Sequence, residues 1–392
     1  MTILPFLAEA ATVANPADLR IWAYLGFIGL VVIFLALDLG VFHREAHEVS
    51  MKESLIWSAI WLTCGISFTG FIYLAYQQHW LGLGLETAQY AKESGAIILG
   101  EVTGSTAAIQ YLTGYVVEKS LAMDNIFVIA MVFGYFAIPN KYQHRVLFWG
   151  IIGALVMRGA MIFLGAELIM AYTWILIFFG FFLILTALKM ALVQNHDDPG
   201  KNPVVKLARK LFRTVDFFDG QKFFTKRTVE PHYIKDPKSG KDVYAPAEPG
   251  TLSAKWAVTP LFLALIMVEI TDLVFAVDSI PAIFAITPDP FIVFTSNIFA
   301  ILGLRALYFC LAALIAKFRF LKPALILILA YVGVKLLLLA LPPYLNDWGL
   351  SATEIKSIKI DPILSLVIVL GTLVVASVMS ILLPAKDEAS HG

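Results

Sequence analysis

Residues 174–193 read WILIFFGFFLILTALKMALV and hold a single charged side chain, Lys189. A helix needs about 20 predominantly apolar residues to cross the hydrocarbon core of a bilayer, and this stretch, which extends back to residue 171, has that length. Other apolar stretches of sufficient length lie at 21–42, 55–76, 107–137, 146–168, 256–286, 291–316, 322–345 and 361–383. The sequence therefore predicts an all-α polytopic membrane protein with about nine transmembrane helices.

The composition agrees with this class and excludes several others. Of the 392 residues, 59% are hydrophobic and 15% are charged, whereas soluble domains have about 45–50% apolar and about 25% charged residues. Lys+Arg and Asp+Glu both number 29, which argues against a nucleic-acid binder. The two cysteines form no CxxC motif, and no HExxH, P-loop or G-x-S-x-G signature is present. We therefore expect a transporter and not an enzyme, with no permanently bound cofactor.

The distribution of Lys and Arg over alternate loops predicts the orientation. With the N-terminus outside, the cytoplasmic segments hold 20 of the 29 cations and the opposite side holds four. This bias predicts an external N-terminus and a cytoplasmic C-terminus, and we expect the protein in the plasma (bacterial inner) membrane. The expected organisation is an external lead-in (1–20), a first membrane half of five helices (21–193), a cytoplasmic basic loop (194–255), a second half of four helices (256–383) and a cytoplasmic tail (384–392).

The long basic loop has two recognisable features. In residues 203–213, apolar side chains fall on one helical face and four cations fall elsewhere, which is typical of a helix on an anionic lipid surface. Further on, Asp236-Pro237-Lys238-Ser239-Gly240 has turn chemistry and predicts a small hairpin.

The two membrane halves contain an internal repeat, 107–193 and 256–345. EKSLAMDNI from Glu118 aligns with DLVFAVDSI from Asp272, so that carboxylates match at both ends. The alignment continues with a matched pair of arginines and a matched pair of lysines, namely Arg158 with Arg305 and Lys189 with Lys335. Because each unit has three helices, the second must run through the membrane in the opposite sense. This predicts an inverted-topology repeat, with a substrate site at the midplane between the units.

Ionisable residues within the predicted spans need an explanation, because each is costly in a membrane. They are Asp38, Glu118, Asp124, Glu269, Asp272, Asp278, Lys119, Arg158, Lys189, Arg305 and Lys335. One interpretation is mutual neutralisation, in which paired charges hold the helices in register. The other is a site for a cation, in which the bases serve as counter-charges.

The types of side chain favour a hard cation. Glu269 and Asp272 share a helical face, and Asp278 lies about 9 Å further along the same helix if that helix is regular. We expect Pro281 to break this helix and free main-chain carbonyls. Asn125 and Ser279, each beside the second acid of its repeat, add neutral oxygens. Carboxylate, amide and hydroxyl oxygens suit Mg²⁺, Ca²⁺ or Mn²⁺, and no histidine lies inside a predicted span.

Four stretches resemble the TerC/Alx family of integral membrane proteins. They lie at residues 37–61 (LDLGVFHREAHEVSMKESLIWSAIW), 111–129, 142–159 and 259–309. The resemblance implies an exporter-like membrane protein, and family members are associated with manganese efflux, tellurium resistance and redox modulation. The residues carried over by motif are Asp38, Glu118, Asp124, Glu269, Asp272 and Asp278, together with Asn125 and Ser279.

These observations predict export of manganese(II) in exchange for protons, with the metal ion as transported substrate. We expect Asp124 and Asp278 as core ligands, and Glu118, Asp272 and Glu269 as ligands or proton carriers, joined by Asn125 and Ser279. Asp38 would lie on the entry path, and Arg158, Arg305, Lys119 and Lys335 would supply counter-charge. The alternatives are a calcium/proton exchanger and a non-transporting assembly, insertion or stress-response factor of the redox-modulator kind. Homo-oligomerisation is left open.

Overall fold

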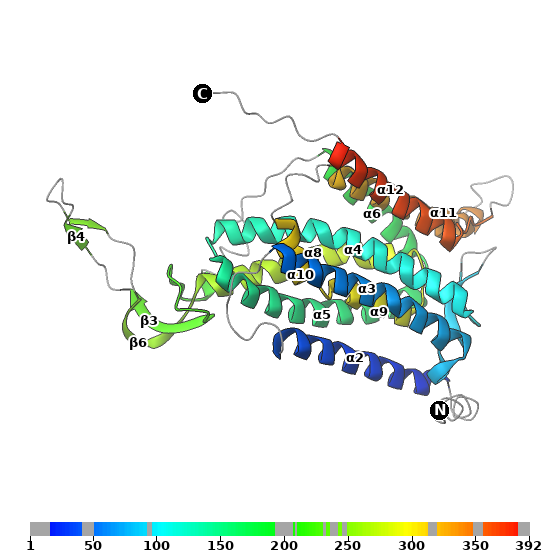
Figure 1. The fold of residues 1–392 in the computed structure, drawn as a ribbon. Helices are drawn as coiled ribbons and strands as arrows, with labels where there is room; N and C mark the ends of the chain where they lie inside the picture. The colour runs from blue at the N-terminus through cyan, green and yellow to red at the C-terminus, as the bar shows by residue number, and fades with distance from the viewer. Residues whose placement is uncertain are drawn as a thin grey trace.

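The computed structural model of the protein describes residues 16–40, 51–91, 96–192, 207, 210–229, 233–235, 242–244, 249–312, 320–347 and 356–382. The chain folds into a bundle of long helices that run alongside one another (Figure 1). They are α2 (Pro16–Gly40), α3 (Met51–Gln77), α4 (Gly104–Tyr135), α5 (Asn140–Ala171), α6 (Ile175–Leu192), α8 (Pro260–Phe284), α9 (Pro290–Ile301), α10 (Leu304–Ala312), α11 (Leu321–Asp347) and α12 (Pro362–Leu382).

Within the described part of the chain, 8 helical segments are long and apolar enough to cross a membrane. They correspond to eight of the nine predicted stretches, which confirms the all-α polytopic membrane fold. The ninth stretch is α4, which has 32 residues but carries Glu118, Lys119 and Asp124 near its middle. Helix α4 packs against α3, α8, α9 and α12 and so lies inside the bundle. The side chains of Glu118 and Lys119 therefore face other helices, where buried partners can offset the cost of their charges.

The interruption in the second half does not lie where the sequence predicts it. Pro281 is inside α8, which continues to Phe284, so the predicted break at this proline is wrong. The chain is instead interrupted between α9 and α10, where Leu302 is extended and Gly303 has φ +81°. A Cβ on Gly303 would lie 2.5 Å from Cβ of Trp61. Both the positive φ and the close approach therefore require glycine.

The helices of the two predicted repeat units pack in corresponding pairs. Helix α4 packs against α9 as α8 packs against α5, while α4 also packs on α8 and α6 on α11. Two units related by a two-fold axis would pair in this way. The inverted repeat stays a prediction that these contacts support.

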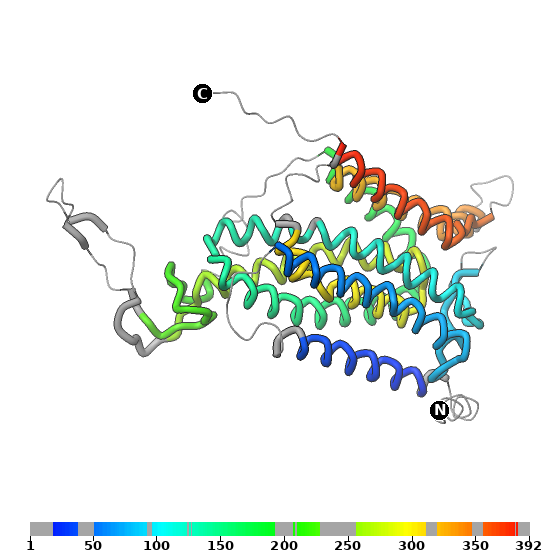
Figure 2. The backbone as a smooth tube through the Cα atoms, in the orientation of Figure 1, coloured from blue at the N-terminus to red at the C-terminus, as the bar shows by residue number. Residues whose placement is uncertain are grey.

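Helix α2 lies at the edge of the bundle (Figure 2). It packs through aromatic rings, with Tyr24 5.1 Å from Phe291 and Phe27 5.6 Å from Phe294 between ring centroids. Much of its apolar surface is exposed, as for Trp22 at 63%, which suits a helix that faces lipid.

Short strands lie at the two ends of the bundle (Figure 1). At the end where α2 begins, β1 (Thr87–Tyr90) pairs with β2 (Ile97–Gly100). At the other end, β3 (Phe224–Val229) pairs with β6 (Pro249–Val258), and β4 (Tyr233–Lys235) pairs antiparallel with β5 (Asp242–Tyr244).

The β4–β5 pair confirms the predicted hairpin, although its turn at 236–241 lies outside the described residues. Most of the predicted 203–213 helix also lies outside them, and residues 207 and 210–211 are helical.

Candidate ion site

Arg158, near the middle of α5, is the centre of a buried polar cluster. Its side chain is 1% exposed. Nε and Nη2 donate to the two carboxylate oxygens of Asp272 on α8, at 3.0 and 2.8 Å. Nη1 lies against Oε1 of Glu118 on α4 and donates to Oδ1 of Asn297 on α9 at 3.1 Å. A guanidinium at this depth needs such partners, because an unpaired buried charge is strongly destabilising.

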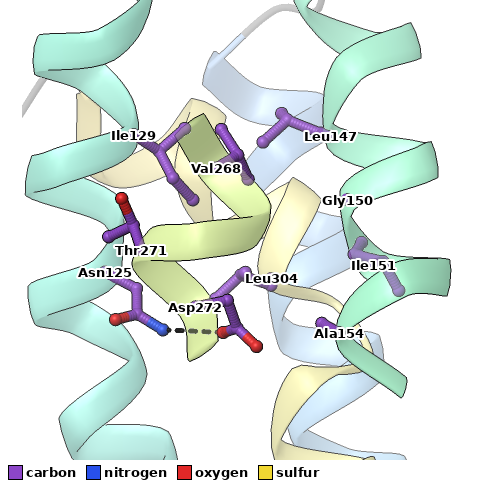
Figure 3. A pocket seen from close by; sticks show the side chains of 10 residues that line it. All are labelled: Asn125, Ile129, Leu147, Gly150, Ile151, Ala154, Val268, Thr271, Asp272 and Leu304. Carbon is purple, nitrogen blue, oxygen red and sulfur yellow. Dashed lines mark hydrogen bonds between the residues drawn. The ribbon is translucent and has the colours of Figure 1, made fainter. Parts of the chain in front are cut away.

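Asp272 is the acid around which the helices meet. Besides the two hydrogen bonds from Arg158, it accepts one from Nδ2 of Asn125 at 3.1 Å. Figure 3 shows this bond crossing from α4 to α8. Ser279, about two turns further along the same face of α8, accepts a hydrogen bond from Nη1 of Arg158 at 3.4 Å. Four helices thus supply one connected set of polar side chains.

The cluster contains more acid than base. Glu118 and Asp272 share the single guanidinium of Arg158. Oε2 of Glu118 and Oδ1 of Asn125 are buried and have no hydrogen-bond partner among the described residues. The cluster therefore carries one excess formal negative charge and two free oxygen acceptors, which a cation or water could satisfy.

A small cavity of about 20 Å³ borders the cluster on the side of α5 (Figure 3). Asp272, Asn125 and Thr271 supply its polar lining, and Gly150 is one of the α5 residues on its wall. This volume is enough for one water molecule. Most of the other lining side chains are aliphatic. Asp272, Asn125 and Thr271 are therefore the lining residues that can bind an ion.

Glu269 lies one turn before Asp272 on α8 and faces α5. Its carboxylate fills the space that a Cβ on Gly153 would take. Oε2 of Glu269 is buried without a hydrogen-bond partner in the described part of the chain. Glu269 is therefore a second acid on the α5–α8 contact, next to the cluster.

Asp278 does not join the cluster. Its Oδ1 accepts a hydrogen bond from Thr186 of α6 at 3.0 Å, on a different side of α8 from Asp272. Of the other predicted acids, Asp124 lies in α4 and Asp38 in α2, but their side chains lie outside the described residues. The structure thus brings together Glu118, Asn125, Arg158, Asp272 and Ser279 and places Asp278 elsewhere.

The remaining predicted counter-charges have separate surroundings. Nζ of Lys119 donates to the main-chain oxygens of Ala300 and Leu302 at 3.0 and 3.4 Å. Lys335 donates to Ser365 of α12 at 2.9 Å. Arg305, at the start of α10, is 5% exposed.

Two polar groups of importance are not among the predicted residues. Asn297 joins the cluster through Arg158, and Thr186 binds Asp278. Both are neutral, so a search for charges in the spans does not find them. The run Thr295-Ser296-Asn297, fully buried in an otherwise apolar helix, is the signal that could have found Asn297.

Comparison with known proteins gives the family. Residues 103–388 match the integral membrane protein TerC family. An uncharacterized membrane protein of Myxococcus xanthus is 39% identical over 363 residues, which covers 92% of each chain. A protein of Photorhabdus laumondii named "Putative membrane-bound redox modulator Alx" is 42% identical over 315 residues, 80% of this chain and 85% of its own length.

The protein of the same name from Escherichia coli K12 is 41% identical over 315 residues, 80% of this chain and 84% of the relative. No solved structure matches the chain. The long match of residues 103–388 and this identity over most of both chains agree with the helical membrane bundle and its buried charges, and the chain belongs to the TerC family of integral membrane proteins.

Proposed function

We propose that the chain is a secondary exporter of manganese(II), which it exchanges for protons through the buried cluster. The observation that carries the proposal is the sharing of one guanidinium by two carboxylates, Glu118 and Asp272. Without a metal ion, Arg158 neutralises half of this charge. An entering divalent cation would take the place of the guanidinium on the same oxygens.

The oxygen donors in reach suit a hard divalent cation. Glu118 and Asp272 would be ligands, and the amide oxygen of Asn125 and the hydroxyl of Ser279 would complete the set together with water. Asp124 keeps its proposed place as a ligand by its position in α4. Asp278 bonds to Thr186 of α6 and lies outside the cluster. It would therefore be a second, separate binding point for the ion along its path.

The need for proton exchange follows from the membrane potential. Moving a divalent cation outward against an inside-negative potential costs about 4.6 kcal/mol per 100 mV, twice the value for one charge. The sequence has no P-loop that would couple transport to ATP. Carboxylates that release protons when they bind a metal ion, and bind protons again after its release, supply the exchange. Glu269 lies next to the cluster, and its buried oxygen has no hydrogen-bond partner in the part of the chain that the structure describes; it is the proposed proton carrier.

The proposed orientation in the bacterial inner membrane has the N-terminus outside and the C-terminus in the cytoplasm. Helix α2 begins at the end of the bundle that carries β1 and β2, whereas α12 ends toward the opposite end, from which β3 and β6 project (Figure 1). The excess of Lys and Arg in the segments assigned to the second end supports a cytoplasmic location for it. The 203–213 segment would then meet anionic lipid, and Asp38 at the inner end of α2 would lie at the entrance.

The proposal is tested by transport in proteoliposomes made with the purified protein. Asp272→Asn keeps the shape of the side chain but removes its charge, so Mn²⁺ flux should fall at least about tenfold while the protein stays monodisperse. The matched control is Glu167→Gln, because Glu167 is exposed on the same helix as Arg158 and should transport normally. Wild-type flux in Asp272→Asn would overturn the assignment. Competition by Ca²⁺ at equal concentration separates manganese export from calcium/proton exchange.

A second candidate follows from the name of the relatives, which describes a redox modulator. Both cysteines of this chain are free, Cys64 on α3 and Cys310 on α10. If the function were redox chemistry of the protein's own thiols, a variant with Cys64→Ala and Cys310→Ala would lose it, whereas an exporter would keep its Mn²⁺ flux.

The third candidate, an assembly or insertion factor, would work through its cytoplasmic surface. A flexible linker in place of residues 230–248 leaves the paired β3 and β6 in place. It should spare ion flux and abolish such a docking function.

A further inference from the structure

The interruption between α9 and α10 ends a helix inside the bundle. The last carbonyl groups of a helix have no partner within it and carry the negative end of its dipole. At the end of α9, the main-chain oxygens of Ala300 and Leu302 both point to one group, Nζ of Lys119 on α4. A single ammonium thus satisfies two carbonyls at the break.

Lys119 makes these contacts in place of an ion pair. Among the described side chains, no carboxylate lies within ion-pair distance of it. Its charge is stabilised by main-chain oxygens at 3.0 and 3.4 Å. In transporters built from interrupted helices, unwound carbonyls and half-helix C-terminal ends coordinate small cations. We propose that the α9–α10 break is a monovalent-cation site, of the kind that takes Na⁺, and that the ammonium of Lys119 fills it permanently.

The break is a fixed feature of the backbone, which gives the site a lasting shape. Gly303 has φ +81°, and Trp61 of α3 packs against it so closely that a Cβ would not fit. Leu302 N still bonds to Ile298 O at 3.0 Å, and Leu307 N bonds to Gly303 O at 3.0 Å. The two half-helices are therefore each closed by their own hydrogen bonds, and the oxygens of Ala300 and Leu302 remain for a cation.

The site is linked to the polar cluster by consecutive residues. Glu118 faces Arg158, which bonds to Asn297 of α9, and Lys119 holds the end of the same α9. Because the cation at the break is tethered, α9 keeps its position beside the cluster without any dissolved ion. This inference concerns the stability of the α9 end and stands whether or not the protein exports manganese.

The test compares two variants that differ in the space they leave. Lys119→Ala opens the site to a dissolved ion, and Lys119→Met removes the charge but keeps it filled. Thermal unfolding of purified protein is measured in NaCl and in choline chloride at equal concentration, since choline is too large for the site. Lys119→Ala should be at least about 2 °C more stable in NaCl, while the wild-type protein and Lys119→Met should show no difference between the salts.

Equal unfolding temperatures of Lys119→Ala in the two salts would overturn the proposal. If this variant unfolds during purification, the readout is its recovery as monodisperse protein in each salt. Recovery in NaCl alone supports the cation site, and equal loss in both salts contradicts it. A wild-type protein that is itself stabilised by Na⁺ relative to choline would contradict permanent occupation by Lys119.

Discussion

Arg158 and Asp272 form a two-pronged ion pair between α5 and α8, with Nε 3.0 Å from Oδ2 and Nη2 2.8 Å from Oδ1. The pair is buried, and Glu118 lies against the same guanidinium. A metal ion that binds Asp272 must compete with this arginine. A strong pair therefore stabilises the bundle and, on the function proposed above, lowers the affinity for the ion.

Arg158→Met should destabilise the protein by about 3–5 kcal/mol, because two buried carboxylates then lose their cation. Millimolar Mn²⁺ should restore stability in this variant more than in the wild-type protein, since the ion can replace the lost charge. Denaturant-induced unfolding with and without Mn²⁺ measures both effects. Arg145→Met, which removes a cation lying 5.2 Å from the ring of Phe223 near the end of the bundle, is the control and should change stability by less than about 1 kcal/mol. An unchanged midpoint in Arg158→Met would contradict the role of the pair.

Gly153→Ala should reduce transport without unfolding the protein. The added methyl group overlaps the carboxylate of Glu269, which is the flexible end of a side chain and can move away. A misplacement of about 1 Å can lower the rate of a positioned group by up to about 10²-fold. Mn²⁺ flux in proteoliposomes should fall by at least about tenfold at an unchanged unfolding temperature. The double variant with Glu269→Asp, whose side chain is shorter, should recover part of the flux.

Gly134→Ala is the matched control for this substitution. Gly134 is also helical, and among the described residues no atom from outside its own helix backbone lies within 4 Å of the position of the new methyl group. Alanine should stabilise this helix slightly, by up to about 1 kcal/mol. Equal flux in Gly153→Ala and Gly134→Ala would exclude a role for the position of Glu269.

The sequence predicts the helices of this protein well because a membrane imposes a strong and simple rule on length and polarity. It also predicts Glu118 and Asp272 as acids inside the spans with Arg158 as a counter-charge, and in the structure both acids contact this arginine. The prediction that Asp124 and Asp278 form the core of the site stays a prediction, because the Asp124 side chain lies outside the described residues. Asp278 does not join Asp272, for a reason of helix geometry. Asp278 lies six residues after Asp272, which is about 240° around the helix, and it therefore faces α6.

The predicted helix break at Pro281 is wrong for a different reason. Proline removes one hydrogen bond, and the last turn of α8 tolerates this loss because Pro281 and the residues that follow it are fully packed. At Gly303 the helix is interrupted by a φ of +81°, and Trp61 occupies the space that a side chain would need there. That contact joins residues far apart in the chain, so no local pattern reveals it.

Gly303→Ala should be among the most destabilising substitutions of a single methyl group in this protein. Alanine at φ +81° costs about 1–2 kcal/mol, and overlap with Trp61 adds about 1–3 kcal/mol. Thermal unfolding should therefore occur several degrees lower. Gly371→Ala in α12, where no atom of the described neighbouring residues lies within 4 Å of the new methyl group, should unfold at the wild-type temperature or slightly above it, because alanine favours the helix. If Trp61→Ala relieves part of the loss in a double-mutant cycle, the overlap is the cause.

Asp219, in the segment before β3, gives the extramembrane sheet a dependence on pH. Burial of its carboxylate acts to raise the pKa, but the hydrogen bond from Thr225 at 2.9 Å and the charges of Arg227 and Lys222 outweigh burial. The pKa of Asp219 therefore lies below its ordinary value of 3.8. The ionised acid contributes stability that is present above about pH 4 and is lost as the pH falls from there through the lowered pKa.

Hydrogen exchange of peptides from residues 214–229 should show this loss directly. After correction for the intrinsic exchange rate, protection of this segment should decrease as the pH falls from 5 to about 3, because protonation removes the attraction of Asp219 to Arg227 and Lys222. In Asp219→Asn, which keeps an oxygen for Thr225 but has no charge to lose, protection should be lower at pH 7 and nearly constant down to pH 3. A wild-type segment with constant protection over the same range would show that the charge of Asp219 does not stabilise the sheet.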